Sequence, residues 1–237
     1  MVAARPLQWL DPHDIEAPFP DVEYALKEPD GLLAVGGDLS PSRLLNAYRH
    51  GIFPWYGKDQ PILWWSPDPR SVLYPDRLKV SRSLRRTLHK NVFRVTADTA
   101  FHRVISHCAE PRQDGLGTWL TEEMIASYFR LHTMGYAHSV ETWYQGELVG
   151  GLYGLSLGRV FFGESMFSRR SDASKVAFAR LVEHLKKWRY ALIDCQIASA
   201  HLTSLGAEAI PRRDFIAILN RQCDDASAWG SWDDVHE

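Results

Sequence analysis

The sequence predicts an α+β fold whose sheet is mainly antiparallel. Two β-rich runs are joined by Gln145-Gly146, a pair of residues typical of a hairpin turn. A third run follows Gly158, and a strong helical pattern at residues 174–188 separates it from one more apolar run. We expect strands at residues 137–144, 147–153, 160–162 and 190–197. A hairpin followed by a helix and a further strand favours this mixed architecture.

Three more helices are predicted, each beginning after a residue that caps a helix N-terminus. Ser and Thr side chains suit this position because they accept a hydrogen bond from an N–H of the first turn. The candidate caps are Ser40 before residues 41–48, Ser81 before residues 82–89, and Thr121 before residues 122–134. Pro41 also favours a helix start, and Gly51 and Gly135 fit the ends of the first and third helices.

A proline-rich segment at residues 66–69 predicts a boundary between two unequal parts. Residues 1–68 are crowded with turn-forming and aromatic residues, which indicates a small N-terminal lobe. Residues 69–237 carry the mixed helix and strand pattern and form the larger domain. The last fifteen residues are acidic and marked by Trp229 and Trp232, and we expect them to be a loosely held tail.

Composition argues against several classes of protein. The chain has 237 residues, of which 45% are hydrophobic, and a formal net charge of −2, so a nucleic-acid site has to be a local patch. The sequence shows no signal-peptide pattern and no apolar run of membrane-spanning length, and we expect a cytoplasmic protein. Three separated cysteines, and ten histidines without ligand spacing, indicate reduced thiols and no metal.

A basic helix is the first feature that points to a function. Residues 77–94 hold seven Lys or Arg and no acidic residue. Four of these cations share one helix face, at positions i, i+3, i+4 and i+8: Arg82, Arg85, Arg86 and Lys90. Such a ridge can follow several phosphates of a nucleic acid. An ordinary solvated helix face is the alternative.

Tryptophans in turn-rich segments are the second feature. Trp55 follows Phe53-Pro54, Trp64 and Trp65 are adjacent, and Trp119 follows a loop that contains two glycines. An unpaired nucleotide end stacks on indole rings with little sequence preference. Core packing is the alternative, and we favour it for at least one of Trp64 and Trp65.

Acidic and amide side chains at two places are candidates for chemistry. Glu164 comes just after the strand predicted at residues 160–162, separated from it by Gly163. It can bind a cation such as an amino terminus, or act as an acid or base with a raised pKa; a plain surface glutamate is the alternative. Asp194 and Gln196 alternate with apolar residues, so we expect them on one strand face, hydrogen-bonded to each other or to a ligand. Catalysis and a satisfied core hydrogen bond both fit this spacing.

Apolar residues from the predicted strands and the helix at residues 174–188 can line a pocket for a branched or aromatic side chain. Three of them lie on one helix face at positions i, i+3 and i+7. The candidate pocket consists of Leu152, Phe161, Met166, Phe178, Leu181 and Leu185. Plain core packing is the alternative for any single member.

Long motifs in the chain resemble those of one enzyme family. In order they read GLLAVGGDLSPSRLLNAYRHGIFPWY, PILWWSPDPRSVL, SRSLRR, GESMFSRRSDASKVA, LIDCQ and HLTSLGAEAIPRRDF. These strings resemble the leucyl/phenylalanyl-tRNA–protein transferase family over nearly the whole chain, from about Phe19 to Leu219. The motifs are long and not generic, so chance does not account for the agreement.

The resemblance implies a bacterial cytoplasmic aminoacyltransferase. Members of this family transfer Leu or Phe, and less readily Met, from aminoacyl-tRNA to proteins with N-terminal Arg or Lys. The product is a degradation signal of the N-end rule pathway. The larger domain is then expected to be similar to the N-acetyltransferase (GNAT-like) fold. No cofactor is expected, because the aminoacyl ester is already activated, and we expect a monomer that does not bind membranes.

The resemblance also implies roles for particular residues. Trp55 and Trp119 would stack on the terminal adenosine of the tRNA, and the four cations of the basic helix would bind its backbone. The six pocket residues would hold the side chain of the transferred amino acid. Glu164, Asp194 and Gln196 fall at catalytic or substrate-orienting positions, with Glu164 facing the cationic acceptor and Asp194 orienting Gln196. The amine proton would pass to Asp194 through Gln196, or to a hydroxyl of the terminal ribose.

One position departs from the family pattern, because Ser199 stands where we expect an asparagine. A shorter side chain there alters the hydrogen bonding available to the ester or peptide. An acyl-CoA-dependent N-acetyltransferase is the main alternative, but residues 169–173 lack glycine and include Asp172, which would repel a pyrophosphate. A non-enzymatic RNA-binding protein is the third class, and it would leave Glu164 and Asp194 without a role.

Overall fold

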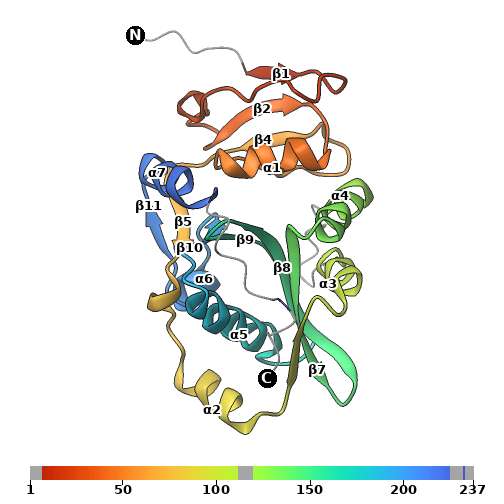
Figure 1. Ribbon diagram of the computed structural model, residues 1–237, viewed down its shortest axis with the longest axis vertical. Coiled ribbons are helices and arrows are strands. Elements are labelled where there is room, and N and C mark those ends of the chain that lie inside the picture. The colour runs from red at the N-terminus through yellow and green to blue at the C-terminus, as the bar shows by residue number, and fades with distance from the viewer. Residues whose placement is uncertain (1–6, 112–119, 225–231, 233–237) are drawn as a thin grey trace.

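The computed structural model describes residues 7–111, 120–224 and 232, and it contains two β-sheets (Figure 1). The smaller sheet has the strand order β1-β2-β4-β3 and lies at the N-terminal end of the molecule. Its strands are β1 (Gln8–Leu10), β2 (Leu32–Gly36), β3 (Phe53–Pro54) and β4 (Leu63–Trp65). The chain enters the larger sheet at Arg70, directly after the proline-rich segment.

The larger sheet confirms the predicted α+β fold with mainly antiparallel pairing. Its strand order is β11-β5-β10-β9-β8-β7-β6. The strands are β5 (Arg70–Leu73), β6 (Arg94–Ala97), β7 (Ala137–Tyr144), β8 (Glu147–Leu157), β9 (Val160–Ser168), β10 (Leu192–Gln196) and β11 (Glu208–Ile210). The neighbours β9 and β10 run parallel, and the other neighbouring pairs of this sheet run antiparallel.

Helices pack on both faces of the larger sheet. They are α1 (Pro41–Arg49), α2 (Arg82–Lys90), α3 (Phe101–Cys108), α4 (Glu122–Thr133), α5 (Ala173–Lys187), α6 (Ala200–Ser204) and α7 (Arg212–Gln222). Figure 1 shows α5 on one face, α3 and α4 on the other, and α1 between the two sheets. None of the described helices is long and apolar enough to cross a membrane.

The three predicted N-caps are confirmed. The hydroxyls of Ser40, Ser81 and Thr121 accept the N–H of the third residue that follows each of them, at 3.3, 3.1 and 3.2 Å. Each cap gives a partner to an N–H that the helix itself cannot satisfy, and is worth about 1 kcal/mol.

Two strands are longer than the sequence predicts. β8 continues past Tyr153 to Leu157, and β9 continues past Phe162 to Ser168. The glycine and glutamate at positions 163 and 164 disfavour a strand by themselves. Pairing of β9 with residues 150–157 of β8 overrides that preference, with a register irregularity at Glu164. Glu164 therefore lies within a strand, and its expected place after a strand end is wrong.

The core continues from one sheet to the other. One cluster of buried apolar side chains includes Leu10 and Trp64 of the smaller sheet together with Leu155 and Phe162 of the larger one. A second cluster lies between the larger sheet and α5. The smaller lobe is therefore packed into the same apolar interior as the α3 and α4 face of the larger sheet.

The expectation of a loosely held tail is wrong for Trp232. Its indole stacks on the imidazole of His138, with ring centroids 4.0 Å apart and planes 7° from parallel. It also contacts Phe161 and Trp188 at centroid distances of 5.9 and 5.3 Å. Trp229 and the rest of the predicted tail beyond residue 224 lie outside the described residues.

Candidate active site

A cavity of about 640 Å³ opens where the parallel strands β9 and β10 separate. The two strands pair from Leu192–Val160 to Asp194–Phe162. Beyond that point β9 follows β8, whereas β10 has an irregular register with β5 and ends at Gln196, whose φ is 54°. Residues 163–168 and 193–199 line the cavity from its two sides.

The α5 side of the cavity is apolar, and it contains five of the six predicted pocket residues. These are Leu152, Phe161, Met166, Phe178 and Leu181. Leu185 is fully buried in the same core cluster but is not one of the residues that line the cavity. It lies one helical turn beyond Leu181, and the shared helix face continues there into the core.

Glu164 lies on the other side, held by two tyrosines that the sequence does not identify. The hydroxyls of Tyr48 on α1 and Tyr128 on α4 donate to its two carboxylate oxygens at 2.8 and 2.9 Å. The two hydroxyls also contact each other at 2.6 Å. On their own helices these tyrosines have the pattern of ordinary core aromatics, so only the tertiary contact reveals their role.

Burial makes Glu164 an unusual acid. Desolvation raises its pKa from the usual 4.5 to about 7, while the hydrogen bonds from the two tyrosines act in the opposite direction. Burial, with Glu164 close by, also raises the pKa of Tyr48 and Tyr128 well above 10. The tyrosines therefore remain hydrogen-bond donors at neutral pH, where the carboxyl group can either hold or release a proton.

Asp194 is fully buried and forms a two-point ion pair with Arg70. The Arg70 Nε and Nη2 atoms donate to the two carboxylate oxygens at 2.8 and 2.7 Å. The guanidinium also lies over the rings of Phe53 and Phe215, 4.8 and 4.7 Å from their centroids. An arginine in an otherwise buried strand is a sequence signal for such a partner, because fully buried charges are almost always paired.

Asp194 and Gln196 are hydrogen-bonded to each other, as expected, through the Asp194 side chain and the Gln196 backbone. The Gln196 backbone N–H donates to Asp194 Oδ1 at 3.0 Å, whereas the Gln196 amide donates to Glu164 Oε1 at 3.2 Å. The expected alternation agrees with these contacts. Ile193 and Cys195 belong to the core cluster on the α5 side, whereas Asp194 and Gln196 reach groups on the side of α1, in spite of the pairing irregularity and the positive φ of Gln196. Asp194 therefore holds the Gln196 backbone, and the amide is free to face the cavity.

Trp55 lies at the cavity wall with 41% of its surface exposed. Trp65 braces it, because its indole N–H donates to the Trp55 carbonyl at 2.7 Å and the two rings meet edge to face. Trp64 is fully buried, which confirms the core interpretation for one of the adjacent pair. Trp119 lies outside the described residues.

The basic helix is exposed but is not part of the cavity wall. Its four cations are all exposed to solvent: Arg82, Arg85, Arg86 and Lys90. This helix packs beside the first half of α5, where Thr87 donates to Asp172 at 3.0 Å. The four cations thus form a separate surface, which we call the α2 ridge.

Ser199, where the sequence departs from the family pattern, has a structural partner. It lines the cavity, and its hydroxyl accepts the N–H of Leu202 at 3.2 Å as the N-cap of α6. Asparagine is equally suited to that position. Among the described residues, no group of three or more His, Cys, Asp or Glu side chains is arranged to hold a metal ion.

Comparison with known proteins identifies close relatives. A family model described as leucyl/phenylalanyl-tRNA protein transferase matches residues 72–220, and the model of its N-terminal domain matches residues 37–68. Leucyl/phenylalanyl-tRNA–protein transferase from Aromatoleum aromaticum is 62% identical over 214 residues, which cover 90% of each chain. The enzyme of the same name from Stutzerimonas stutzeri is 60% identical and covers 94% of this chain and 97% of its own.

Solved structures give a weaker likeness. L-PGS from Bacillus licheniformis has a TM-score of 0.37 and 10% identity, covering 63% of this chain and 48% of its own. A GCN5-related N-acetyltransferase from Kribbella flavida has a TM-score of 0.35 and 12% identity, covering 68% and 58%. The fold assignment therefore rests on the strand order and pairing themselves.

Proposed function

The chain belongs to the leucyl/phenylalanyl-tRNA–protein transferase family, and we propose that the cavity between β9 and β10 is where the aminoacyl end of the tRNA meets the acceptor protein. The enzyme moves Leu or Phe from aminoacyl-tRNA to protein N-termini. One observation carries the assignment of the site: the cavity has an apolar wall towards α5 and an acidic group, Glu164, held from α1 and α4.

The apolar wall is suited to the side chain of the transferred amino acid. Its five members offer no charge, so they accept Leu or Phe, and with less complementarity Met. A β-branched side chain places an extra methyl group near the fixed ester, where a misfit costs about 1–3 kcal/mol. We expect isoleucyl-tRNA to compete with leucyl-tRNA poorly. Equal inhibition by the two in a competition assay would contradict this assignment of the wall.

Glu164 is suited to the acceptor, which we propose carries N-terminal Arg or Lys. Its pKa of about 7 leaves a large share of the carboxyl group ionised at neutral pH, where it attracts a cation. The α-ammonium of a protein has a pKa of about 8. The two values differ by roughly one unit, so Glu164 can take a proton from the ammonium at small cost and leave the neutral amine that attacks.

The reaction then needs little beyond positioning. The amine nitrogen attacks the ester carbonyl, a C–N bond forms, and the C–O bond to the terminal ribose breaks. The proton left on nitrogen ends on the ribose oxygen that departs, so the atoms balance without a further reactant. The Gln196 amide, which donates to Glu164 Oε1, is placed to hydrogen-bond the amine or the ester.

In this proposal Asp194 positions Gln196 by holding its backbone. Both of its oxygens already accept hydrogen bonds from Arg70, and Oδ1 also accepts the Gln196 N–H. A carboxylate so occupied is a poor proton acceptor, which favours the ribose oxygen over a relay through Gln196 as the destination of the last proton. We expect Asp194→Ala to lose rate because the Gln196 backbone loses its anchor.

For the tRNA we propose stacking of the terminal adenosine on Trp55 and backbone contacts on the α2 ridge. Trp55 is half-exposed at the cavity wall and fixed by Trp65, which suits a stacking platform. The N-terminus of α5, where an acyl-CoA enzyme would bind pyrophosphate, instead holds Asp172, whose oxygens contact Thr87 and Lys175. That carboxylate argues against a CoA-dependent reaction. We further propose a cytoplasmic monomer whose product is a degradation signal.

The decisive experiment mixes the purified protein with radiolabelled leucyl-tRNA and a protein that begins with Arg, without ATP or CoA. Label on the acceptor is the expected result. A matched acceptor that begins with Glu tests the proposed preference and should stay unlabelled. Label that remains on the tRNA, with acetyl-CoA supporting modification of the acceptor, would overturn the proposal.

A further inference from the structure

Trp232 lies directly behind one wall of the amino-acid pocket. Phe161 lines the cavity, and the Trp232 indole contacts the Phe161 ring at a centroid distance of 5.9 Å. Trp188, at the C-terminal end of α5, meets the same indole edge to face. Among the described residues that line the cavity Trp232 does not appear, so any effect it has on the pocket passes through Phe161.

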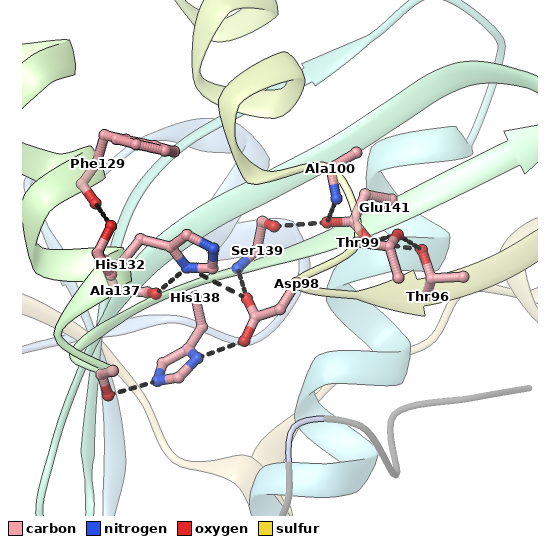
Figure 2. A network of polar contacts seen from close by, with 12 residues as sticks. Thr96, Asp98, Thr99, Ala100, Phe129, His132, Ala137, His138, Ser139 and Glu141 are labelled. Atoms are coloured by element: carbon pink, nitrogen blue, oxygen red, sulfur yellow. Dashed lines mark hydrogen bonds and ion pairs between the residues drawn. The ribbon is translucent and has the colours of Figure 1, made fainter.

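The Trp232 indole stacks on His138, whose side chain is held in one orientation by its hydrogen bonds. His138 stacks under it with planes 7° from parallel, and His138 is itself buried. Its Nδ1 lies 2.7 Å from Asp98 Oδ2, and its Nε2 lies 3.1 Å from the Gly135 carbonyl oxygen (Figure 2). Asp98 in turn accepts the backbone N–H of Ser139 at 2.8 Å. The imidazole is therefore fixed at both nitrogens.

The sheet leaves a place for these rings. His138 on β7 is opposite Gly154 on β8, and Gly154 is opposite Gly163 on β9. A Cβ at Gly154 would lie 2.7 Å from the Phe161 ring, so this ring lies directly on the bare backbone there. The missing side chain at Gly154 leaves room for the Phe161 ring, and Phe161, Trp232 and His138 contact one another in that order from the cavity inward.

We propose that Trp232 is a specificity-determining positioning residue, because its indole holds the Phe161 ring in place and so sets the depth of the amino-acid pocket. The proposal rests on the proposed function, since it takes the apolar wall as the site of the transferred side chain. Without the indole, Phe161 gains space behind it and the pocket deepens. A phenylalanine side chain can fill the added depth, whereas leucine is too short to pack against the displaced wall.

The test compares kcat/KM for phenylalanyl-tRNA and leucyl-tRNA in Trp232→Ala. We expect the Phe-to-Leu ratio to rise by about tenfold, the lower end of what one methylene group is worth in an apolar pocket. Trp232→Phe retains a ring against Phe161 and should stay near the wild-type ratio. Trp9→Ala is the matched control, since Trp9 is 66% exposed on the smaller sheet, and should leave the ratio unchanged.

A second variant tests the stacking of His138 on Trp232 independently. His138→Asn keeps a side-chain donor for Asp98 but removes the stacking ring, so it should shift the ratio in the same direction as Trp232→Ala. If Trp232→Ala does not fold, Trp232→Leu should give a smaller shift of the same sign. Equal losses with both aminoacyl-tRNAs, or an unchanged ratio, would overturn the inference while leaving the transferase intact. A wild-type protein that transfers neither amino acid would overturn the proposed function and the inference with it.

Discussion

The Glu164 carboxyl group lies between two tyrosine hydroxyls and has a pKa of about 7. An acid with a raised pKa is ionised only above that value, so the form that binds a cation is lost as pH falls through about 7. We expect kcat/KM for the acceptor to rise with pH near 7 for this reason. The α-ammonium of the acceptor gives a second rise near its own pKa of about 8.

Glu164→Gln separates these two contributions. The amide keeps an oxygen that a tyrosine hydroxyl can use but cannot ionise. In this variant the rise near pH 7 should disappear, the rise near pH 8 should remain, and KM for the acceptor should increase. Steady-state kinetics across this pH range provide the measurement. An unaltered profile in Glu164→Gln would show that another group titrates near 7.

The buried pair of Arg70 and Asp194 makes a prediction about stability. Removing one partner leaves an uncompensated buried charge, which costs about 3–5 kcal/mol. Arg70→Met should therefore reduce the free energy of unfolding by that amount in urea titrations. Adding Asp194→Leu removes the stranded charge, and the double variant should be more stable than Arg70→Met alone. A double variant that loses as much as the sum of both single changes would contradict this account.

At the scale of the element, α2 carries four exposed cations that form no ion pair with the described residues. We expect Arg85→Glu combined with Arg86→Glu to weaken tRNA binding and to reduce the slope of log affinity against log salt by about one for each phosphate that is no longer neutralised. Thermal unfolding should barely change, because both side chains are exposed. Arg213→Glu on α7 is a control, since its side chain is 82% exposed away from the ridge. An unchanged salt slope would remove the α2 ridge from the tRNA site.

Elements with a regular apolar period and a clear cap are predictable from the sequence, as α1, α2 and α4 show. The second half of β9 is not, because a glycine and a glutamate weaken its local strand preference and only pairing with β8 specifies it. α3 has no side-chain N-cap to mark its start, and β11 has three residues, too few to show an alternation. Local sequence patterns therefore predict which helices and strands form, whereas tertiary pairing determines where a strand such as β9 ends.

The same distinction holds for the site. Glu164 and Asp194 can be identified as candidates from the sequence, because an acid among apolar neighbours is costly to bury unless it has a partner. Tyr48 and Tyr128 are not, because they lie on separate helices and meet only in the folded chain. The contact of the Gln196 amide with Glu164 is not predictable either, because the two residues lie on separate strands.

At the scale of the whole molecule, the two lobes share both their core and their chemistry. The smaller lobe supplies the Tyr48 hydroxyl to Glu164 and the Gly51 carbonyl to Arg70, at 2.8 and 3.1 Å. Arg212 on α7 donates to the Ser66 carbonyl at 2.7 Å, so the connection is made from the opposite end of the chain as well. One apolar cluster runs through both sheets. The site is therefore complete only when the lobes are docked.

This arrangement predicts that the lobes unfold together. A lobe that shares its core with its neighbour cannot unfold separately without exposing the apolar surface of both. Urea unfolding followed by tryptophan fluorescence, which reports on Trp64 in the smaller sheet among others, should coincide with unfolding followed by far-UV circular dichroism. Tyr48→Phe, which removes one hydroxyl at the junction, should move both transitions by the same amount. Two separated transitions, or a shift in the fluorescence curve alone, would show that the smaller lobe is an independent unit docked on the catalytic sheet.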